Sequence, residues 1–440
     1  MDTLEREKRA VYRRNVYGTS VVEFVWGLGF PIMLESTFLQ LFLKHLGASD
    51  FAIGAVPALF IAGISCFPLF ASYCARNYRM KRPVVLALHL CSAFSVVLFG
   101  ILLLAITSTA LVIPLFFFCY AIFSISIGLT IPVWLNYLVR IFPDAQTVSA
   151  LGFMMLAQNT GKIVASLIMV RVVERFAFSP TSSAVVFIVT GVVFIIASLC
   201  FLITREIADP DDPPPDNGSL GQHIATTLAD IRANRRFLVF LAADLDFPVV
   251  LTIMSFYANY ATLHFDVPLA VAAGAFVACI YSGSITVNIV LGAMNLLSLK
   301  QKFVLGKTIT LSLLLILIVL PSLPAFFLVS YLLGFVRAIR NMVYAPAVKN
   351  FCKKVDVTPY FSLAPILTLP VAVGYPLLFG RLLDLLAGLG VDSYRVVFGI
   401  SFLFICLTLV LSFYTDFTAE NKATGGRTGP AASCGAEQTT

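Results

Sequence analysis

Long apolar stretches recur along the whole chain, and each is at least ~18 residues long. A helix of that length crosses the ~30 Å hydrocarbon core of a membrane. Only 12% of the residues are charged and the mean hydropathy is +0.93, whereas soluble domains carry roughly 25% charged residues. A membrane β-barrel would instead show alternating segments of about ten residues, and the sequence has none. The pattern predicts an all-α integral membrane protein.

The apolar pattern predicts twelve transmembrane helices. The first stretch is too long for the apolar core of a cleavable signal peptide, and no small-residue cleavage site follows it. The expected spans are residues 16–44, 51–74, 83–106, 110–139, 147–172, 182–203, 237–264, 267–295, 303–320, 322–347, 359–380 and 395–415.

Lys and Arg residues are distributed unevenly between alternate loops. If the N-terminus is cytoplasmic, 22 of them lie on the cytoplasmic side, five on the outer side and three within spans, which accounts for all 30. Cytoplasmic loops are enriched in Lys and Arg, so both termini are predicted to be cytoplasmic, in the inner (cell) membrane. The net charge of +7 follows from this bias, and it requires no nucleic-acid partner.

The chain divides near its middle, at the acidic, proline-rich stretch DPDDPPPDNG. Proline excludes a regular helix there, so an extended linker is expected. Leu220, Ile224, Leu228 and Ile231 then share one helical face, which predicts a short amphipathic helix, either on the membrane surface or packed on the protein. The expected divisions are an N-terminal six-helix half (1–205), a cytoplasmic linker with this helix (206–236), a C-terminal six-helix half (237–416) and a disordered cytoplasmic tail (417–440).

Several features repeat at a constant offset of 210 residues. The repeat predicts two pseudo-symmetric six-helix halves. For the charged residues, the alternative is a local i, i+3 surface pair at the end of a helix. The matched residues are Trp134 with Tyr344, Arg171 with Arg381, and Glu174 with Asp384.

The whole pattern resembles the major facilitator superfamily. The shared features are twelve spans, six-helix halves, a cytoplasmic central loop and a basic loop after span two, ASYCARNYRMKR. The resemblance covers nearly all of the membrane portion, and it implies a fold in which two halves rock around a central site. The Gly-Pro-Gly-Gly pattern of drug/proton antiporters is missing from span five, and span four has no basic residue before Arg140. Both absences argue against a typical multidrug exporter.

The family's signature after span two reads roughly G-x-L-A-D-R-x-G-R-K, and it falls here on ASYCARNYRM. Arg76 and Arg79 match, but Ala75 stands in the place of the Asp. A second copy, GAMNLLSLKQK, keeps Gly292 and Lys300. The resemblance implies that these matching residues form a gate loop that lacks the usual Asp. The alternative for the basic residues is a plain topology signal.

Ionisable side chains inside a membrane are costly and usually functional. Spans six, nine and twelve are expected to have none in their interiors, and span three only His89. The resemblance implies that these four spans are peripheral, whereas spans one, five, seven and ten line or flank the central cavity. The intramembrane ionisable residues on those four spans are Glu23, Glu35, Lys162, Asp244, Asp246, Arg337 and Arg340.

Depth along the helices places Lys162 and Arg337 within reach of the midplane. We expect these two cations to hold an anionic group of a substrate. Glu23, Asp244 or Asp246 is expected to carry a coupling proton, because low dielectric favours the neutral form of a carboxyl group. The alternative is that the acids and bases pair with one another, and that the aromatic residues only pack. Further candidate substrate contacts are Gln158, Asn341, Tyr344, Trp26 and Trp134.

Other classes of function have little support in the sequence. The four His residues lie far apart without metal-ligand spacing, and no Gly-x-x-x-x-Gly-Lys nucleotide loop occurs, so no metal or cofactor is expected. The sequence predicts a monomeric secondary active transporter rather than an enzyme, which moves a small organic solute with H⁺ as the coupling ion. The alternatives are an exporter of amphiphilic compounds and a non-transporting sensor on the same fold.

Overall fold

The computed structural model describes residues 3–34, 37–75, 78–106, 108–143, 146–176, 178–208, 220–294, 296–352, 358–415 and 417. These residues form helices joined by short connections. Twelve helical segments are long and apolar enough to cross a membrane, so the predicted all-α membrane fold is confirmed. Glu35, Arg76 and the acidic linker lie outside the described residues.

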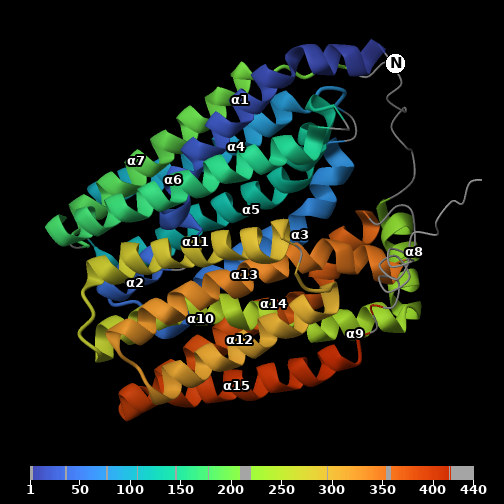
Figure 1. The fold of residues 1–440 in the computed structure, drawn as a ribbon. Coiled ribbons are helices and arrows are strands. Elements are labelled where there is room, and N and C mark those ends of the chain that lie inside the picture. Colours follow the sequence, from blue (N-terminus) through green and yellow to red (C-terminus); the bar gives the residue numbers. More distant parts are fainter. Residues whose placement is uncertain are drawn as a thin grey trace, which may run out of the picture.

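The first six spans form the N-terminal half, which is coloured blue to green in Figure 1. Residues 4–45 form one candidate span, as predicted, and within it α1 ends at Met33 and a second, short helix follows whose residues 38–43 are all buried. The helices are α1 (Thr3–Met33), α2 (Phe38–His45), α3 (Asp50–Ala75), α4 (Arg82–Ala105), α5 (Thr109–Ile141), α6 (Thr147–Phe176) and α7 (Pro180–Leu199), followed by the 3-10 turn η2 (Cys200–Ile203).

The last six spans form the C-terminal half, coloured yellow-green to red in Figure 1. Span seven is broken at Asp244 and Leu245, so that it consists of two helices. The helices are α9 (Arg235–Ala243), α10 (Asp246–His264), the π-helical η3 (Val271–Ala275), α11 (Phe276–Val287), the π-helical η4 (Asn288–Ala293), α12 (Leu299–Val319), α13 (Leu323–Cys352), α14 (Thr358–Leu385), the 3-10 turn η5 (Ala387–Leu389) and α15 (Val391–Phe413).

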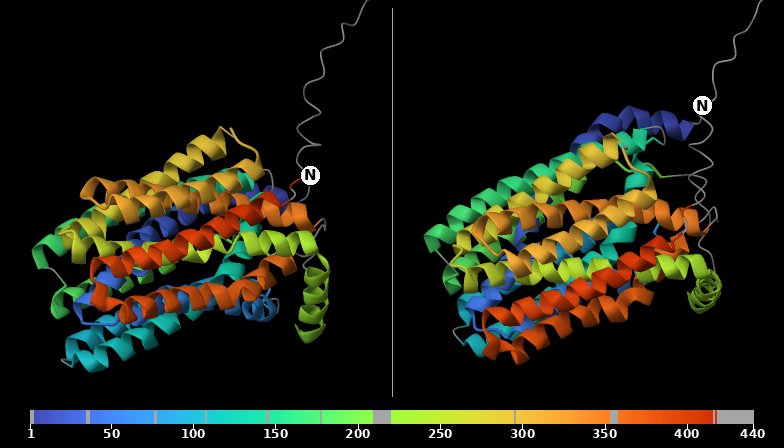
Figure 2. Two further views of the ribbon diagram at one scale, coloured as in Figure 1. Left: turned by 90° about the horizontal axis from the view of Figure 1, so that it is seen from below. Right: turned by 60° about the horizontal axis from the view of Figure 1, so that its bottom comes forward.

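The amphipathic helix α8 (Leu220–Ala233) lies across one end of the bundle, as Figure 2 shows. Ile231 is fully buried in an apolar cluster with Phe237 and Phe351, and Ile224 packs against the same cluster. The predicted apolar face of this helix therefore packs on the protein at these two residues. We call this end of the molecule the α8 end, and the opposite end, which α2 covers, the α2 end.

Glycines bring helices of the two halves into backbone contact along two seams. A side chain on Gly54 of α3 would collide with the backbone of α14, and one on Gly380 of α14 would collide with the backbone of α3. In the second seam, a side chain on Gly274 of η3 would collide with the carbonyl oxygen of Ser166 in α6. Small residues permit such close approach of membrane helices. The halves therefore meet along α3–α14 and α6–η3.

Candidate substrate and coupling site

A close contact between α1 and α6 positions the first group of charged residues. A side chain on Gly27 would collide with the carbonyl oxygen of Gln158, and one on Gly161 would collide with the carbonyl oxygen of Phe24. Because both positions lack a Cβ, the two helices touch through their backbones. Polar residues on their facing sides are thereby brought within hydrogen-bonding distance.

Glu23 of α1 and Lys162 of α6 are both buried, at 5% and 8% exposure. Gln158 Nε2 donates a hydrogen bond of 2.5 Å to Glu23 Oε2, and the positive charge of Lys162 acts on the same carboxylate. Lys162 Nζ lies 4.6 Å from the centre of the Phe30 ring, within the range of a cation–π attraction. The structure thus brings together three of the predicted site residues. We call Glu23, Gln158 and Lys162 the α1–α6 cluster.

The α1–α6 cluster reaches the other half of the molecule through Tyr281. This residue belongs to α11, and its ring centre lies 5.2 Å from Lys162 Nζ. Met155 lies two turns from Lys162 on the same face of α6, and Asn288 lies two turns from Tyr281 on the same face of its span, both towards the α8 end. Both residues are exposed. Lys162 and Tyr281 therefore contact each other across the α6–α11 seam, whereas the residues two turns further on are exposed.

The α2 end is closed by a carboxylate of α14. Asp384 accepts hydrogen bonds from the backbone N–H groups of Asp50 and Phe51, at 2.8 and 2.9 Å. These groups lie at the N-terminus of α3, where backbone N–H groups have no intrahelical acceptor. Lys44 of α2 also pairs with Asp50 at 2.8 Å. One side chain of the C-terminal half thus caps a helix of the N-terminal half, and the structure is closed at the α2 end.

The repeat-related acid on α6 behaves differently. Glu174 pairs with Arg171 at 3.0 Å on the surface, as the i, i+3 spacing predicts. Asp384, which corresponds to Glu174 at the offset of 210, instead joins the two halves. The predicted local ion pair is therefore confirmed for Glu174. For Asp384, the same prediction misses the contact with the other half.

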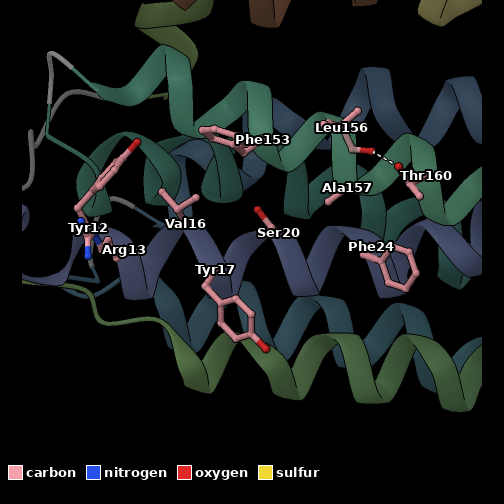
Figure 3. Close-up of a pocket in the computed structure, with 10 residues that line it drawn as sticks. All are labelled: Tyr12, Arg13, Val16, Tyr17, Ser20, Phe24, Phe153, Leu156, Ala157 and Thr160. Carbon is pink, nitrogen blue, oxygen red and sulfur yellow. Dashed lines mark hydrogen bonds between the residues drawn. The ribbon is translucent and has the colours of Figure 1, made fainter.

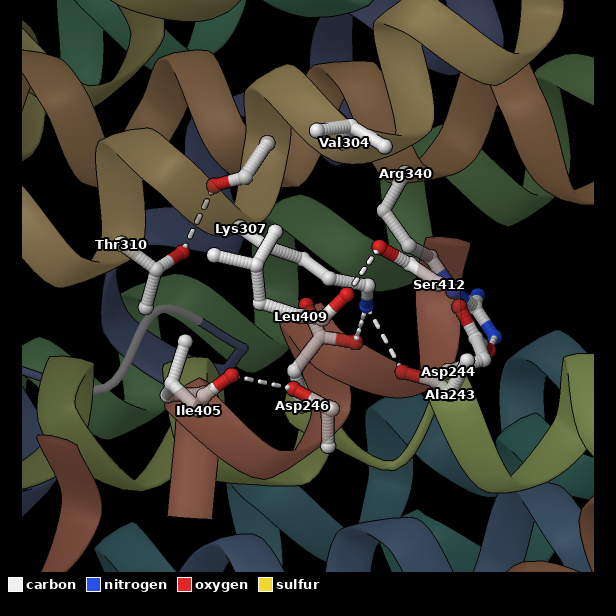
Figure 4. Close-up of polar contacts among 12 residues, drawn as sticks. Ala243, Asp244, Asp246, Val304, Lys307, Thr310, Arg340, Ile405, Leu409 and Ser412 are labelled. Carbon is white, nitrogen blue, oxygen red and sulfur yellow. Dashed lines mark hydrogen bonds and ion pairs between the residues drawn. The ribbon is translucent and has the colours of Figure 1, made fainter. Parts of the chain in front are cut away.

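A second charged group lines a cavity of about 160 Å³ between α3, α10, α13 and α14. Arg340 Nη2 donates to Asp244 Oδ2 at 3.0 Å, and its guanidinium lies 4.0 Å from the centre of the Tyr344 ring. Figure 4 shows Arg340 beside Asp244 at the break of span seven. The Nε atom of Arg340 is buried without an acceptor among the described residues. Of the residues predicted for the site, Asp244 and Tyr344 line this cavity.

Asp246, the other acid at the break, pairs with Lys307 of α12. Lys307 Nζ donates to Asp246 Oδ1 at 2.5 Å and to the carbonyl oxygen of Ala243 at 2.7 Å, as Figure 4 shows. The Lys307 side chain is only 1% exposed. Its ammonium group therefore joins the last carbonyl of α9 to the first residue of α10. These contacts favour a structural ion pair for Asp246, the alternative that the sequence left open.

The sequence placed Lys307 in a cytoplasmic loop and left span nine without an interior charge. Both predictions are wrong, because α12 begins at Leu299, behind a capping box formed by Ser298 and Gln301. That start places Lys307 about two turns inside the helix. The sequence does indicate an intramembrane lysine, because Lys307 falls within the predicted span 303–320. Arg340 was likewise recognised as intramembrane but passed over in favour of its neighbour Arg337.

The remaining residues that were predicted to contact the substrate lie on different helices and do not form one site. Arg337 is half-buried on α13, one turn from Arg340, and Asn341 of the same helix is exposed. Trp26 stacks on Phe194, with ring centres 3.9 Å apart, inside the N-terminal half, a placement that favours packing. Trp134 is half-buried on α5.

Two of the predicted gate-loop residues lie in helices rather than in a loop. Gly292 belongs to η4, and Lys300 lies in the first turn of α12, where its Nζ donates to the carbonyl oxygen of Phe413 at 3.1 Å. Their assignment to a loop is therefore corrected, because π-helical turns extend span eight and the capping box starts α12 early. Arg79 is exposed, and its carbonyl oxygen accepts a hydrogen bond from Arg140. Arg76 lies outside the described residues.

The fold and its buried charges define a class of protein. Twelve apolar helices in two groups, with charged residues buried inside the spans, are the architecture of a membrane transporter. The chain belongs to the Major Facilitator Superfamily, whose family model matches residues 18–355.

Solved structures with the same fold have low sequence identity to the chain. A point mutant of the nucleoside transporter NupG has a TM-score of 0.70 at 14% identity, over 92% of this chain and 99% of that one. A point mutant of the peptide transporter POT, in complex with alafosfalin, has a TM-score of 0.68 at 13% identity, over 94% and 99%. A bacterial homologue of the human lysosomal transporter Spinster has a TM-score of 0.61 at 14% identity, over 98% and 100%. Among curated proteins, a sequence comparison finds no match.

Proposed function

We propose that the chain is a secondary active transporter that moves a small organic solute by alternating access, with a proton as the coupling ion. The observation that carries this proposal is the position of the α1–α6 cluster. Its buried acid and ammonium groups and its half-buried amide lie within membrane-spanning helices, and Lys162 reaches Tyr281 of the other half. Intramembrane charges at such a place are typical of substrate and proton sites.

Within this proposal, Lys162 supplies the positive charge for an anionic group of the solute, together with Arg337 from α13. Gln158, Asn341 and Tyr344 supply further polar contacts. The unpartnered Nε of Arg340 adds a hydrogen-bond donor in the cavity between the halves. A guanidinium with an open donor is a good partner for a carboxylate or phosphate oxygen.

Glu23 is the best-supported carrier of the coupling proton. Asp244 and Asp246, the other candidates, each form an ion pair with a base of the same half, Arg340 and the buried Lys307 respectively. Glu23 instead accepts a hydrogen bond from the neutral amide of Gln158, and the charge of Lys162 acts on it from the neighbouring helix. A carboxyl group that accepts a hydrogen bond from a neutral amide keeps that partner whether or not it is ionised, because the amide offers both a donor and an acceptor.

We propose that the α8 end is cytoplasmic, in the inner (cell) membrane, so that both termini are cytoplasmic. With Lys307 inside a helix, 21 Lys and Arg residues are assigned to that side, against five on the other, and the bias persists. A thiol reagent that cannot cross the membrane should label a cysteine at Ser108, an exposed position at the α2 end, in intact cells. It should spare a cysteine at Met294, which is exposed at the α8 end. The reverse labelling would overturn the orientation.

The two halves, residues 1–205 and 237–416, are proposed to move as units around the site. In the opposite state the α2 end opens and the α8 end closes. The proposed gate residues among the described ones are Arg79, Gly292 and Lys300, and Arg76 joins the proposal through the sequence motif alone. Because the α1–α6 cluster and both seams form within one chain, we propose that the monomer is the functional unit.

Thermal stabilisation by ligands tests the proposed function. The panel consists of organic anions, sugars, peptides and nucleosides, since transporters of nucleosides and of peptides share this fold. At least one anionic member should raise the Tm of the wild-type protein, and the increase should vanish in Lys162→Gln. A panel without effect on the wild-type protein would count against a solute site. An unchanged increase in Lys162→Gln would remove Lys162 from it.

A further inference from the structure

A groove on the outer surface of the N-terminal half runs between α1 and α6, on the side away from the other half. Its volume is about 570 Å³, within the ~300–1,000 Å³ of typical ligand pockets. The two helices touch where Gly27 and Gly161 allow backbone contact, and they diverge from there towards the α8 end. The groove fills the wedge between them. Figure 3 shows its lining, with Val16 and Ser20 on α1 facing Phe153 and Leu156 on α6.

The polar groups of this groove are arranged along its length. Arg13 lies at the wide mouth and is exposed, and no hydrogen bond or ion pair joins it to another described residue. Ser20, about 10 Å deeper along the helix, points its hydroxyl group from α1 towards α6 in Figure 3. It too has no hydrogen-bond partner among the described residues. By contrast, Thr160 on the opposite wall donates to the carbonyl oxygen of Leu156 at 2.9 Å.

An unsatisfied hydroxyl is unusual in a membrane helix, because the hydrocarbon core offers no water to replace a missing partner. Other hydroxyls in the same helices bond to carbonyl oxygens one turn back, as Thr19 does to Asn15 and Ser166 to Lys162. The groove therefore presents a cation at its mouth, an open hydroxyl group below it and an apolar floor. The distance from Arg13 to Phe24 is about 16 Å along the helix, close to one leaflet of the ~30 Å hydrocarbon core.

We infer that this groove binds an anionic glycerophospholipid. The phosphate group lies at Arg13, an ester oxygen of the glycerol region accepts a hydrogen bond from Ser20, and one acyl chain lies along Val16, Phe153 and Leu156. The charge of the surrounding segment fits this ligand, because the first turns of α1 contain five basic residues against two acids between Thr3 and Arg14. Basic clusters next to a transmembrane helix attract anionic lipids.

Such a lipid would touch the outer side of the contact between α1 and α6, whose inner side holds the α1–α6 cluster. It would act as a wedge that keeps the two helices apart near the α8 end while they stay in contact at Gly27. The inference concerns a lipid and does not depend on the identity of the transported solute.

Spin-labelled phosphatidylglycerol tests the inference on the full-length protein in phosphatidylcholine nanodiscs. The wild-type protein should immobilise the labelled lipid at a saturable site. Arg13→Gln should weaken this association about tenfold, the order expected for the loss of one charge-assisted hydrogen bond. Ala157→Phe, which fills the groove from the α6 wall, should abolish it. A second arm adds soluble glycerol phosphate, which should not displace the lipid, because it lacks the acyl chain.

Two matched controls separate a site from general surface effects. Arg9→Gln removes an exposed cation from the same helix outside the groove, and Leu403→Phe enlarges a 69% exposed residue on α15. Both should change the association by less than about twofold. Equal losses in Arg13→Gln and Arg9→Gln would show diffuse attraction by surface charge and would overturn the inference. So would displacement of the lipid by glycerol phosphate, which would indicate a site for a free phosphate group.

Discussion

Asp384→Ala should shift the protein from the state that is closed at the α2 end towards a state that is open there. The substitution removes two hydrogen bonds from a carboxylate to the N-terminus of α3, and these bonds exist only while the α2 end is closed. A carboxylate that accepts two hydrogen bonds at a helix N-terminus contributes about 2–3 kcal/mol to the free energy of the closed α2 end. The ratio of the two states should therefore change by roughly 30–150-fold. The fold itself should persist, because the lost contacts join the halves rather than stabilise either one.

Distances between spin labels measure this shift. One pair of labels, at Thr181 and Leu389, reports the α2 end, and a second pair, at Gln146 and Met294, reports the α8 end; all four positions are exposed. In Asp384→Ala the first distance should lengthen and the second should shorten.

The repeat supplies the control for this experiment. Glu174→Ala removes the counterpart acid, whose exposed ion pair with Arg171 lies within one helix and contributes at most ~1 kcal/mol. Its distance distributions should match those of the wild-type protein. Unchanged distances in Asp384→Ala, or the same change in both variants, would show that the capping contact does not hold the α2 end closed.

Lys307→Met should cost the most stability of any single substitution considered. It leaves the carboxylate of Asp246 buried without its partner and removes the donor to the carbonyl oxygen of Ala243 at the end of α9. Breaking a buried ion pair in this way costs about 3–5 kcal/mol, which for a chain of 440 residues corresponds to a fall in Tm of roughly 3–5 °C.

A double substitution shows whether the unpaired charge is the cause. Lys307→Met combined with Asp246→Asn should recover most of the lost Tm, because a neutral amide replaces the stranded carboxylate. Lys300→Met serves as the control, since Lys300 lies in the first turn of the same helix and donates only to a carbonyl oxygen. If Lys307→Met lowered the Tm no more than Lys300→Met, or if Asp246→Asn brought no recovery, the ion pair would not stabilise the break in span seven.

The number and order of the membrane spans could be predicted because apolar length is a property of the local sequence. The depth of Glu23 and Lys162 could be predicted for the same reason, since a helix has a fixed rise per residue. That these residues form one site could not be predicted from their depth, because Glu23 meets Gln158 only where Gly27 and Gly161 allow α1 and α6 to touch. That contact depends on helix packing, which the spacing of charges does not encode.

The misses have a common physical origin. A lysine near the start of an apolar span looks like the end of a loop, and only the packing of α12 against the break in span seven brings Lys307 to Asp246. The spacing of Arg381 and Asp384 suggests a local pair, but the N-terminus of α3 offers two backbone donors across the seam. In both cases the partner is distant in the sequence.

Solute uptake driven by a pH gradient tests the central claim most directly. Proteoliposomes containing the wild-type protein should accumulate the solute that stabilises it when the side of entry is made acidic. Glu23→Gln should still exchange this solute across the membrane without a gradient, but it should no longer accumulate it, because the residue that carries the proton is gone. Lys162→Gln should lose both activities while its folding remains intact. Accumulation by Glu23→Gln at the wild-type level would contradict the account and leave the α1–α6 cluster as a structural contact between two helices.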